Sequence, residues 1–252
     1  GQVDIFEPTY IVSANIIQST NPICAGDATG TATVNAEGGT PNYTYVWSNG
    51  QTSLIATGLV AGAYQVTATD QRGCAATANI VLREPAALNV TASVFSNYNG
   101  ADVTCPNAAD GMGRVIVSGG TGAYSYTWST VPTQNTAIAS GLAAGTYNVS
   151  VADATGCQVV RSITLENPVP LAATISHMDV FCNGKTNGQI LVNATPGTGT
   201  LGINGYEYAI YGPNQTGNVF SNINAYYGLA AGTYTVVVRD GNNCTLPLSV
   251  EI

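Results

Sequence analysis

Charge is what this sequence has least of. Asp, Glu, Lys and Arg make up 8% of its 252 residues, and Lys185 is the only lysine. Six basic side chains against 14 acidic ones cannot form a basic stripe, so the composition excludes a nucleic-acid partner. The same shortage excludes attraction to anionic membranes by charge. No apolar run is long enough to cross a bilayer, so we expect no direct membrane insertion.

Patterns for catalysis and zinc binding are missing as well. His177 is the only histidine, and no Cys-x-x-Cys or Cys/His grouping has the spacing of a zinc site. A Ser/His/Asp arrangement has no support, because His177 lies between two repeats and has no recurring partner. We therefore expect no catalytic residues, no metal site and no enzyme.

Three copies of one phrase dominate the chain. It occurs as GLVAGAYQVTATDQRGC at 58–74, GLAAGTYNVSVADATGC at 141–157 and GLAAGTYTVVVRDGNNC at 228–244. A period of about 80 residues indicates whole domains in tandem, since solenoid units are shorter. We place immunoglobulin-like repeats at 9–84, 85–167 and 168–252, the third being divergent with longer loops.

Both ends of the sequence fall inside this pattern. Residues 3–8 (VDIFEP) resemble the ends of the first two repeats, IVLREP at 80–85 and ITLENP at 163–168. We therefore interpret residues 1–8 as the last strand of a preceding repeat. On this interpretation the sequence is a piece of a longer array.

Six cysteines recur as one pair per repeat, at Cys24 and Cys74, Cys105 and Cys157, and Cys182 and Cys244. A pair at a repeated position favours one disulfide within each repeat, formed in an oxidising, extracytoplasmic compartment. Closing a loop of about 50 residues stabilises a fold by about 4 kcal/mol in the chain-entropy account. The alternative is six reduced, buried cysteines that act as small hydrophobes.

Short runs rich in Val, Thr, Ile and Tyr predict β-strands throughout, and no window has sustained helical periodicity. About seven strands per repeat favour an all-β fold of tandem immunoglobulin-like antiparallel β-sandwich domains, one disulfide each, arranged end to end. Proline cannot donate to a sheet ladder, so Pro85 and Pro168 suit the joints between repeats. A glycine follows each first cysteine at a constant distance, which predicts a tight hairpin turn at Gly30, Gly111 and Gly188.

Aromatic side chains recur at fixed places in the repeats. Trp47 and Trp128 belong to alternating aromatic stripes in the first two copies, and we expect them to pack in the core. Each copy also has a tyrosine five residues after a leucine, at Tyr64, Tyr147 and Tyr234. This pattern resembles the tyrosine corner of immunoglobulin-like sandwiches, whose hydroxyl bonds to nearby backbone.

The third repeat carries the best candidates for a binding site. Its connection from Ile210 to Leu229 spans 19 residues, against 12 and 14 in the first two copies. The connection adds four aromatic side chains, Tyr211, Phe220, Tyr226 and Tyr227. Displayed outward, such side chains stack on a sugar or an apolar partner. Folded inward, they replace the tryptophan that this copy lacks.

A further hypothesis is that acidic side chains near the junctions between repeats bind calcium. Hard cations require several oxygen ligands. Acidic residues recur near the joints and in the late turns, at Glu7, Glu84, Glu166, Asp70, Asp153 and Asp240. The simpler interpretation is that each aspartate caps its own turn through an Asx hydrogen bond. We expect no other cofactor.

In combination these motifs resemble the SprB repeat of large surface proteins from gliding Bacteroidetes. The matching positions in the first copy are Cys24, Gly38-Gly39-Thr40, Tyr43, Tyr45, Trp47, Leu59, Ala61-Gly62, Tyr64, Val66, Asp70 and Gly73-Cys74. The second copy matches at the corresponding positions between Cys105 and Cys157. The third copy departs from the pattern, with Pro196-Gly197-Thr198 in place of the GGT motif and Ile210 at the tryptophan position.

The resemblance implies a non-catalytic segment of a very large secreted protein at the extracellular face of the cell, exported by type IX secretion. We expect a structural or adhesive stalk, or an extracellular filament, that serves cell adhesion or gliding motility. Expected partners are neighbouring repeats of the same long chain, further copies in a homo-oligomeric filament, and surface glycans, prey or substratum. The alternative is an accessory carbohydrate-binding module array of a secreted protein.

Overall fold

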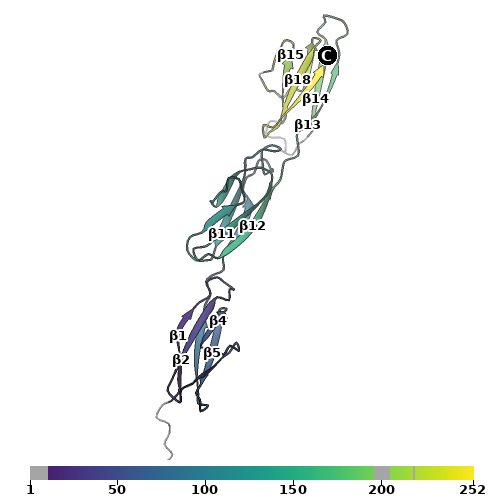
Figure 1. The fold of residues 1–252 in the computed structure, drawn as a ribbon. Helices are drawn as coiled ribbons and strands as arrows, with labels where there is room; N and C mark the ends of the chain where they lie inside the picture. The colour runs from purple at the N-terminus through teal and green to yellow at the C-terminus, as the bar shows by residue number, and fades with distance from the viewer. Residues whose placement is uncertain (1–10, 196–204, 218) are drawn as a thin grey trace, which may run out of the picture. The chain divides into compact units, whose positions relative to one another are not determined.

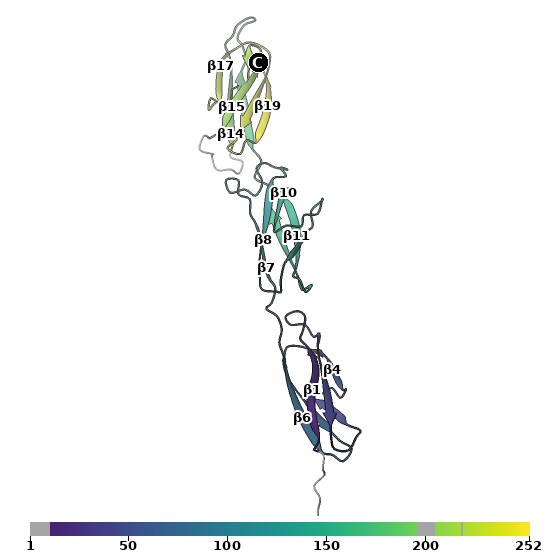
Figure 2. The ribbon, with the colours of Figure 1, turned by 90° about the vertical axis from the view of Figure 1, so that its left-hand side faces the viewer.

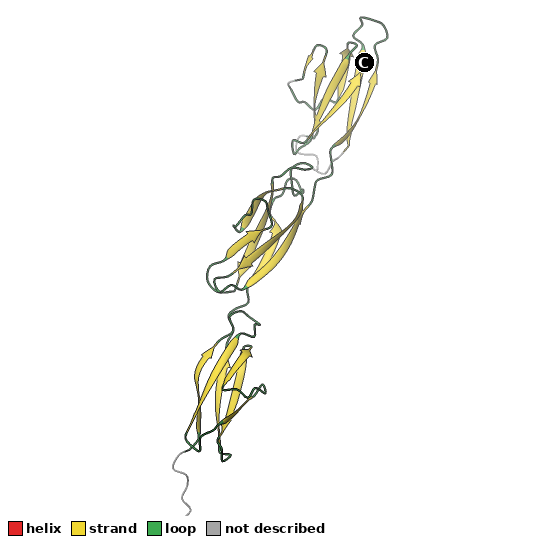
Figure 3. Ribbon diagram, viewed as in Figure 1, coloured by secondary structure: helices red, strands yellow, loops and turns green. Residues whose placement is uncertain are grey.

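The structure is a computed structural model that describes residues 11–195, 205–217 and 219–252. All regular secondary structure in these residues is β-strand (Figure 3). Among them there is accordingly no helix of membrane-spanning length and hydropathy. The segment 1–8, interpreted above as the last strand of a preceding repeat, lies outside the described residues.

Six strands make up the first repeat: β1 (Ser13–Thr20), β2 (Gly30–Glu37), β3 (Thr44–Trp47), β4 (Ile55–Leu59), β5 (Gly62–Thr69) and β6 (Ala75–Leu82). They form two antiparallel sheets, with the orders β1-β2-β4 and β3-β5-β6 (Figure 1). β5 and β6 pair without interruption from Gly62 opposite Leu82 to Thr69 opposite Ala75. The last strand of the repeat is therefore held along its whole length.

The second repeat has the same plan, with β7 (Asn89–Val94), β8 (Gly111–Ser118), β9 (Ser125–Trp128), β10 (Ile138–Leu142), β11 (Gly145–Ala152) and β12 (Gln158–Leu165). Its sheets have the orders β10-β8-β7 and β12-β11-β9. These orders match the first repeat strand for strand. The internal sequence repeat is thus a repeat of topology as well.

The third repeat adds one strand to this plan. It contains β13 (Ala172–Met178), β14 (Gly188–Thr195), β15 (Glu207–Gly212), β16 (Gln215–Thr216), β17 (Ala225–Leu229), β18 (Thr233–Arg239) and β19 (Thr245–Glu251). Its sheets have the orders β13-β14-β17 and β16-β15-β18-β19 (Figure 2). The added strand β16 lies in the longer connection, so the described residues form seven strands here and six in each of the other repeats.

Alternating side chains build the core between the two sheets of a repeat. Along β2, Ala32 and Val34 are fully buried, while the residues between them are only partly covered. They pack against Trp47 and Val66 of the facing sheet in one apolar cluster. The third repeat has an equivalent cluster that joins β14 to β18. The predicted all-β fold of tandem immunoglobulin-like sandwiches is confirmed.

The chain divides into two compact units, and the boundary between them passes through the second repeat. One unit consists of residues up to Val90 with Val117–Ser125 and Val151–Val159. The other consists of Thr91–Ile116, Tyr126–Ser150 and Val160–Ile252. Each unit therefore combines one outer repeat with part of the second repeat.

The glycines that follow the first cysteines do not form hairpin turns, contrary to the sequence prediction. Gly30, Gly111 and Gly188 are the first residues of β2, β8 and β14, and none has a positive φ. A Cβ at Gly30 would lie 2.7 Å from the Leu59 carbonyl oxygen and 2.8 Å from the Leu82 side chain. Glycine stands there because the neighbouring strands approach too closely for any side chain.

Candidate functional site

An aspartate carboxylate organises the turn before each second cysteine. In the second repeat, Asp153 Oδ1 accepts the N–H groups of Thr155 and Cys157, both at 2.9 Å. The equivalent bonds recur at Asp70 in the first repeat and at Asp240 in the third. Each aspartate therefore caps its own turn, as an Asx side chain does. The cap fixes the backbone of the cysteine that follows.

The same donors favour the ionised carboxylates of Asp70 and Asp153. Burial raises the pKa of Asp153, but the Thr155 hydroxyl and several backbone N–H groups outweigh it, so the net pKa lies below the ordinary value. For Asp70, the N–H of Thr40 is the strongest influence, and it lowers the pKa. A charged carboxylate is the better acceptor for these bonds. The turns are therefore most stable when the aspartates are charged.

Each first cysteine lies in the loop between the first two strands of its repeat. In the first repeat the Cys24 carbonyl accepts the Asp27 N–H at 3.1 Å, and Gly26 has a φ of 79°. Glu84, just beyond β6, accepts the Gly26 N–H at 2.7 Å. The Cys24 loop is thus fastened to the segment where the last strand ends.

The two cysteines of one repeat consequently lie at opposite ends of its last strand. Cys74 directly precedes β6, whose eight residues lead to the Cys24 loop. At about 3.3 Å per residue this strand separates the two positions by roughly 25 Å, and a disulfide spans at most ~7 Å between Cα atoms. The prediction of one disulfide within each repeat is therefore wrong.

Disulfides instead join successive repeats. Cys24 bonds to Cys157 and Cys105 bonds to Cys244, with a Cα–Cα distance of 5.6 Å in each case. Each bond links the first cysteine of one repeat to the second cysteine of the next. Each bond also lies within one of the two compact units. The remaining cysteines, Cys74 and Cys182, are exposed and form no disulfide.

The loops that these disulfides close are much longer than the sequence suggested. The bonded cysteines are separated by 133 and 139 residues. A single loop of this length stabilises the folded state by about 5 kcal/mol in the chain-entropy account. The two loops overlap between Cys105 and Cys157, so their contributions are not independent.

Polar contacts accompany the second disulfide. Cys244 Sγ lies 3.2 Å from the Thr104 carbonyl oxygen. The side-chain amide of Asn242 donates to the carbonyl oxygens of Tyr98 and Thr104, both at 3.3 Å. Asn242 belongs to the turn that Asp240 caps. One turn therefore carries the bonded cysteine and also binds the loop of the preceding repeat.

The two tryptophans lie in the core. Trp47 and Trp128 are 2% and 1% exposed. Their indole N–H groups donate to the carbonyl oxygens of Ser53 and Thr136, both at 2.9 Å. An indole that is buried and also hydrogen-bonded contributes to packing and offers no surface for a ligand.

The recurring tyrosines form the same bond in all three repeats. The hydroxyls of Tyr64, Tyr147 and Tyr234 each donate to the carbonyl four residues earlier, at 3.1, 3.1 and 3.0 Å. This is the hydrogen bond of a tyrosine corner. It fastens the start of the late strand to the preceding turn, and it places these tyrosines in structural roles.

Two of the four candidate binding aromatics are engaged in packing. Tyr226 is half-buried against the core of the third repeat, and burial raises its pKa. Phe220 lies beneath the Arg239 guanidinium, whose carbon is 4.0 Å from the ring centroid. Arg239 Nε in turn donates to Glu207 Oε2 at 3.1 Å. Ile210 occupies the tryptophan position and is 7% exposed.

The other two candidates face solvent but do not share a surface. Tyr211 is 39% exposed on β15, and Tyr227 is 70% exposed on β17. These strands belong to different sheets of the sandwich. Tyr227 borders a shallow pocket with Met178 and Leu191. The structure therefore does not bring the four aromatics into one binding site.

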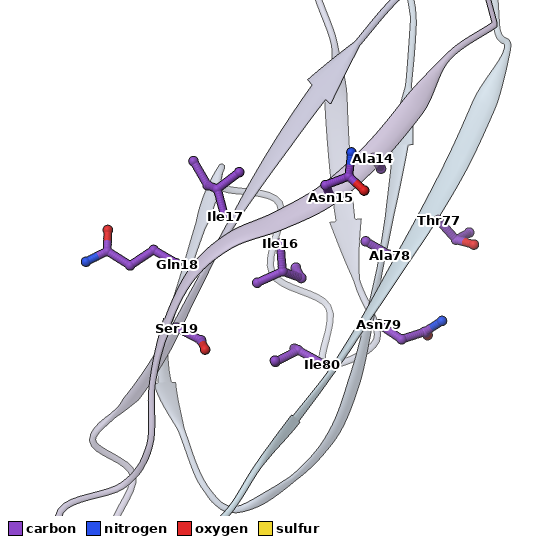
Figure 4. A pocket seen from close by; sticks show the side chains of 10 residues that line it. All are labelled: Ala14, Asn15, Ile16, Ile17, Gln18, Ser19, Thr77, Ala78, Asn79 and Ile80. Atoms are coloured by element: carbon purple, nitrogen blue, oxygen red, sulfur yellow. The ribbon is translucent and has the colours of Figure 1, made fainter.

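A groove lies in the first repeat, between the edge strands β1 and β6 of its two sheets. Ile16 of β1 and Ile80 of β6 point into the space between the strands, whereas Ile17 and Gln18 point away from β6 (Figure 4). Ile16 and Ile80 also pack on the core. No residue that lines the groove is aromatic, so it offers no stacking platform for a sugar.

Acidic side chains do not converge on a common point in the part of the chain that the structure describes. No three His, Cys, Asp or Glu side chains there are placed to hold a metal ion. Glu84 is engaged by the Gly26 N–H, and Asp70 by its own turn. Glu7, a candidate calcium ligand in the sequence, lies outside the described residues.

The family model of the SprB repeat matches two segments of the chain, residues 16–52 and 97–133. Each segment begins before the first cysteine of its repeat and ends just after the tryptophan, so one contains Cys24 and Trp47 and the other contains Cys105 and Trp128. No curated protein matches the chain. The family resemblance inferred from the motifs is therefore confirmed for the first two repeats.

Several solved structures are similar to the chain at low identity. A structure concerning host cell surface retention of a 1.5-MDa bacterial ice-binding adhesin matches at 15% identity and a TM-score of 0.39, with 96% of each chain covered. A tetra-tandem repeat from the extending region of a large adhesion protein matches at 16% identity and a TM-score of 0.27, over 97% of this chain and 74% of that one. The N-terminal eight Ig domains of Down Syndrome Cell Adhesion Molecule match at 12% identity and a TM-score of 0.43.

The alignment with the last structure covers 95% of this chain but 36% of the other. This chain thus spans about a third of the length of that relative. The fold assignment rests on the strand pairing described above and not on these likenesses.

Peptide mapping under non-reducing conditions tests the disulfide pattern. We expect linked peptides containing Cys24 with Cys157 and Cys105 with Cys244, and two thiols that react with an alkylating reagent, Cys74 and Cys182. The physical reason is the length of the last strand, which keeps the cysteines of one repeat apart. A linked peptide containing Cys24 with Cys74 would contradict the pattern.

Acid should weaken the second repeat through Asp153. Its pKa is lowered in the folded state, so its contribution to stability is present above its unfolded pKa of about 4 and is lost as pH falls through the folded pKa. Asp153→Asn should lower the denaturation midpoint at pH 7 and reduce the further loss of stability on acidification. Asp27→Asn, at an exposed loop position, is the matched control. Equal acid sensitivity in the wild type and Asp153→Asn would refute this role.

Proposed function

The chain carries SprB repeats, and from this premise we propose that it is a stalk segment of a very large secreted protein or extracellular filament at the cell surface. In this role it transmits force between the cell and the surface or other cell to which the protein attaches. Export by type IX secretion and service in gliding motility belong to the same proposal. The proposal assigns no catalysis to this segment.

The disulfides that cross repeat boundaries are the observation that carries the proposal. Force applied to the two chain ends follows the shortest covalent path between them. That path runs to Cys24, crosses to Cys157, returns along the chain to Cys105 and crosses to Cys244. Once both bonds are taut, residues 25–104 and 158–243 bear no backbone tension.

This path protects most of the array from unfolding under load. All strands from β2 to β7 and from β12 to β18 lie outside it. The backbone of these strands therefore carries no load when the ends are pulled. The load falls on β1, on β8 to β11 and on β19, which lie on the path. A covalent path that bypasses most strands of the first and third sandwiches favours a mechanical role, because disulfides of this kind contribute nothing to recognising a ligand.

The proposed partners follow from the same role. They are neighbouring repeats of the same chain, further copies in a homo-oligomeric filament, and a surface, glycan or prey cell at the far end of the protein. The low charge of the segment supports a neutral polar surface between these attachment points. Few charges leave little long-range attraction between a stalk and unrelated molecules.

An accessory carbohydrate-binding role is the second candidate, and exposed Tyr227 is the observation that favours it. Tyr227 is 70% exposed and borders a pocket with Met178 and Leu191. Apolar rings of this kind stack on sugar faces. Binding of the chain to a glycan array that Tyr227→Ala abolishes would favour this candidate over the stalk.

Stretching single molecules between their ends tests the mechanical path. With both disulfides intact, roughly a third of the chain lies on the path, so the maximum extension should be roughly 290 Å at ~3.4 Å per residue. After reduction the extension should reach about 860 Å. Replacing Cys105 and Cys244 with serine removes one bond and should give about 400 Å. Extension of the oxidised chain to its full length would refute the shielded path.

Immunogold labelling of intact source cells tests the location. An antibody raised against this segment should decorate projections that extend from the cell surface, because a stalk holds its attachment point away from the cell. Antigen found only in the medium, with unlabelled cells, would contradict the stalk and favour an accessory module of a secreted protein.

A further inference from the structure

Two cysteines occupy positions whose counterparts in the other repeats are bonded. Cys74 stands where Cys157 and Cys244 stand in the second and third repeats, and Cys182 stands where Cys24 and Cys105 stand in the first two. All four counterparts form disulfides, whereas Cys74 and Cys182 are exposed and form none. The unpaired state therefore follows from position in the array.

The turn that carries Cys74 already has the conformation of the bonded turns. The Asp70 N–H donates to the Cys74 carbonyl at 2.9 Å, and the same bond at Asp153 and Asp240 measures 3.0 Å. The residue before the cysteine has a positive φ in all three, 88° at Gly73. The turn is therefore ready to form a disulfide before any partner arrives.

The loop that carries Cys182 is preformed in the same way. The Lys185 N–H donates to the Cys182 carbonyl at 3.1 Å, which matches the bond from Asp27 to Cys24 at 3.1 Å. The second residue after the cysteine again has a positive φ, 76° at Gly184 and 79° at Gly26. This loop also has the backbone of its bonded counterpart.

Apolar surface next to Cys182 is more exposed than at its counterpart in the first repeat, where Ile23 is 54% exposed. Phe181 precedes Cys182 and is 75% exposed. Its counterpart Ile23 borders a hollow that Thr121 and Thr155 of the second repeat also line. The Ile23 carbonyl oxygen lies 3.6 Å from Cys157 Sγ. The Cys182 loop thus presents the same acceptor and a larger apolar side chain to solvent.

We propose that both cysteines are joints for further repeats of this kind in the same chain. Cys182 pairs with the second cysteine of the repeat that follows, and Cys74 pairs with the first cysteine of the repeat that precedes. The partner is thus another SprB-type sandwich, which places its Asp-capped turn against the Phe181–Cys182 loop. This inference rests on the proposed function, since it extends the covalent path of the stalk from repeat to repeat.

Bond formation removes two protons and two electrons from a pair of thiols. The oxidant is the disulfide of a thiol–disulfide oxidoreductase of the extracytoplasmic compartment. One cysteine thiolate attacks that disulfide and forms a mixed disulfide, with one oxidoreductase thiolate leaving. The second cysteine thiolate then displaces the oxidoreductase, which departs as a dithiol. The S–S bond forms between repeats and the oxidoreductase is reduced.

A designed tandem protein gives Cys182 a following repeat with which to pair. In this protein the full chain is followed by a copy of residues 83–86 and then by a second copy of residues 11–252. This junction keeps the register, because Ile252 packs on Gly188 as Leu82 packs on Gly30. The Ile11 carbonyl likewise lies beside Gly38 as the Ala87 carbonyl lies beside Gly119. Cys182 of the first copy then faces Cys74 of the second.

Counting reactive thiols in the tandem protein after secretion to an oxidising compartment tests the pairing. We expect two thiols, and a non-reduced digest with Cys182 linked to Cys74. Cys182→Ser in the first copy should raise the count to three, because it leaves its partner unpaired. Cys74→Ser in the first copy should lower the count to one, because that cysteine has no neighbour. Four thiols in the tandem protein and three in both variants would overturn the proposal.

The single chain is the control for pairing between separate molecules. It should remain monomeric with two reactive thiols under the same conditions. Disulfide-linked multimers of the single chain would show that these cysteines join different chains, which would overturn the assignment to neighbouring repeats. Thiol counts do not depend on where the protein sits on a cell, so this inference and the proposed function fail separately.

Discussion

The direction of antiparallel strands is the constraint on which the covalent structure depends. In each repeat the first cysteine lies beside the end of the last strand and the second cysteine lies at its start. Cys24 is near Glu84, whereas Cys74 directly precedes Ala75. An eight-residue strand is far longer than a disulfide. A cysteine that forms a disulfide must therefore find its partner in another repeat, and the two disulfides of this chain join successive sandwiches covalently.

The aspartate-capped turns before the second cysteines differ less between the repeats than the apolar cores do. The third repeat lacks the tryptophan and fills the space with Ile210, Tyr208 and the half-buried Tyr226. The carboxylate of Asp240 nevertheless accepts the same two backbone N–H groups of its turn as the carboxylate of Asp153 does. A core tolerates exchange of one large side chain for several others if volume is kept. A disulfide tolerates only a narrow range of geometries, so the turn that positions it is held by a charged cap.

Much of this arrangement was accessible from the sequence, and the errors have identifiable causes. Asp110-Gly111 is a favoured hairpin dipeptide, yet Gly111 begins β8. Glycine stands there because a Cβ would meet the Leu165 side chain, and not because the chain turns. The recurrence of two cysteines in every repeat suggests a bond within each repeat. The recurrence does not reveal that the two cysteines lie at opposite ends of the last strand. The number of strands between Cys24 and Cys74 was the signal that could have corrected it. No feature of the sequence predicted which aromatic side chains of the third repeat pack inward and which face solvent.

The sequence by itself determined the three sandwiches, the positions of Trp47 and Trp128, and the tyrosines that tie the late strands to their turns. These follow from local periodicity and from a motif that occurs three times, which is information that neighbouring residues carry. Only the tertiary structure decided which cysteines meet. Cys24 and Cys157 are 133 residues apart, and their contact depends on how one whole repeat follows another. No local pattern specifies that placement, because it results from the summed direction and length of every strand between the two cysteines.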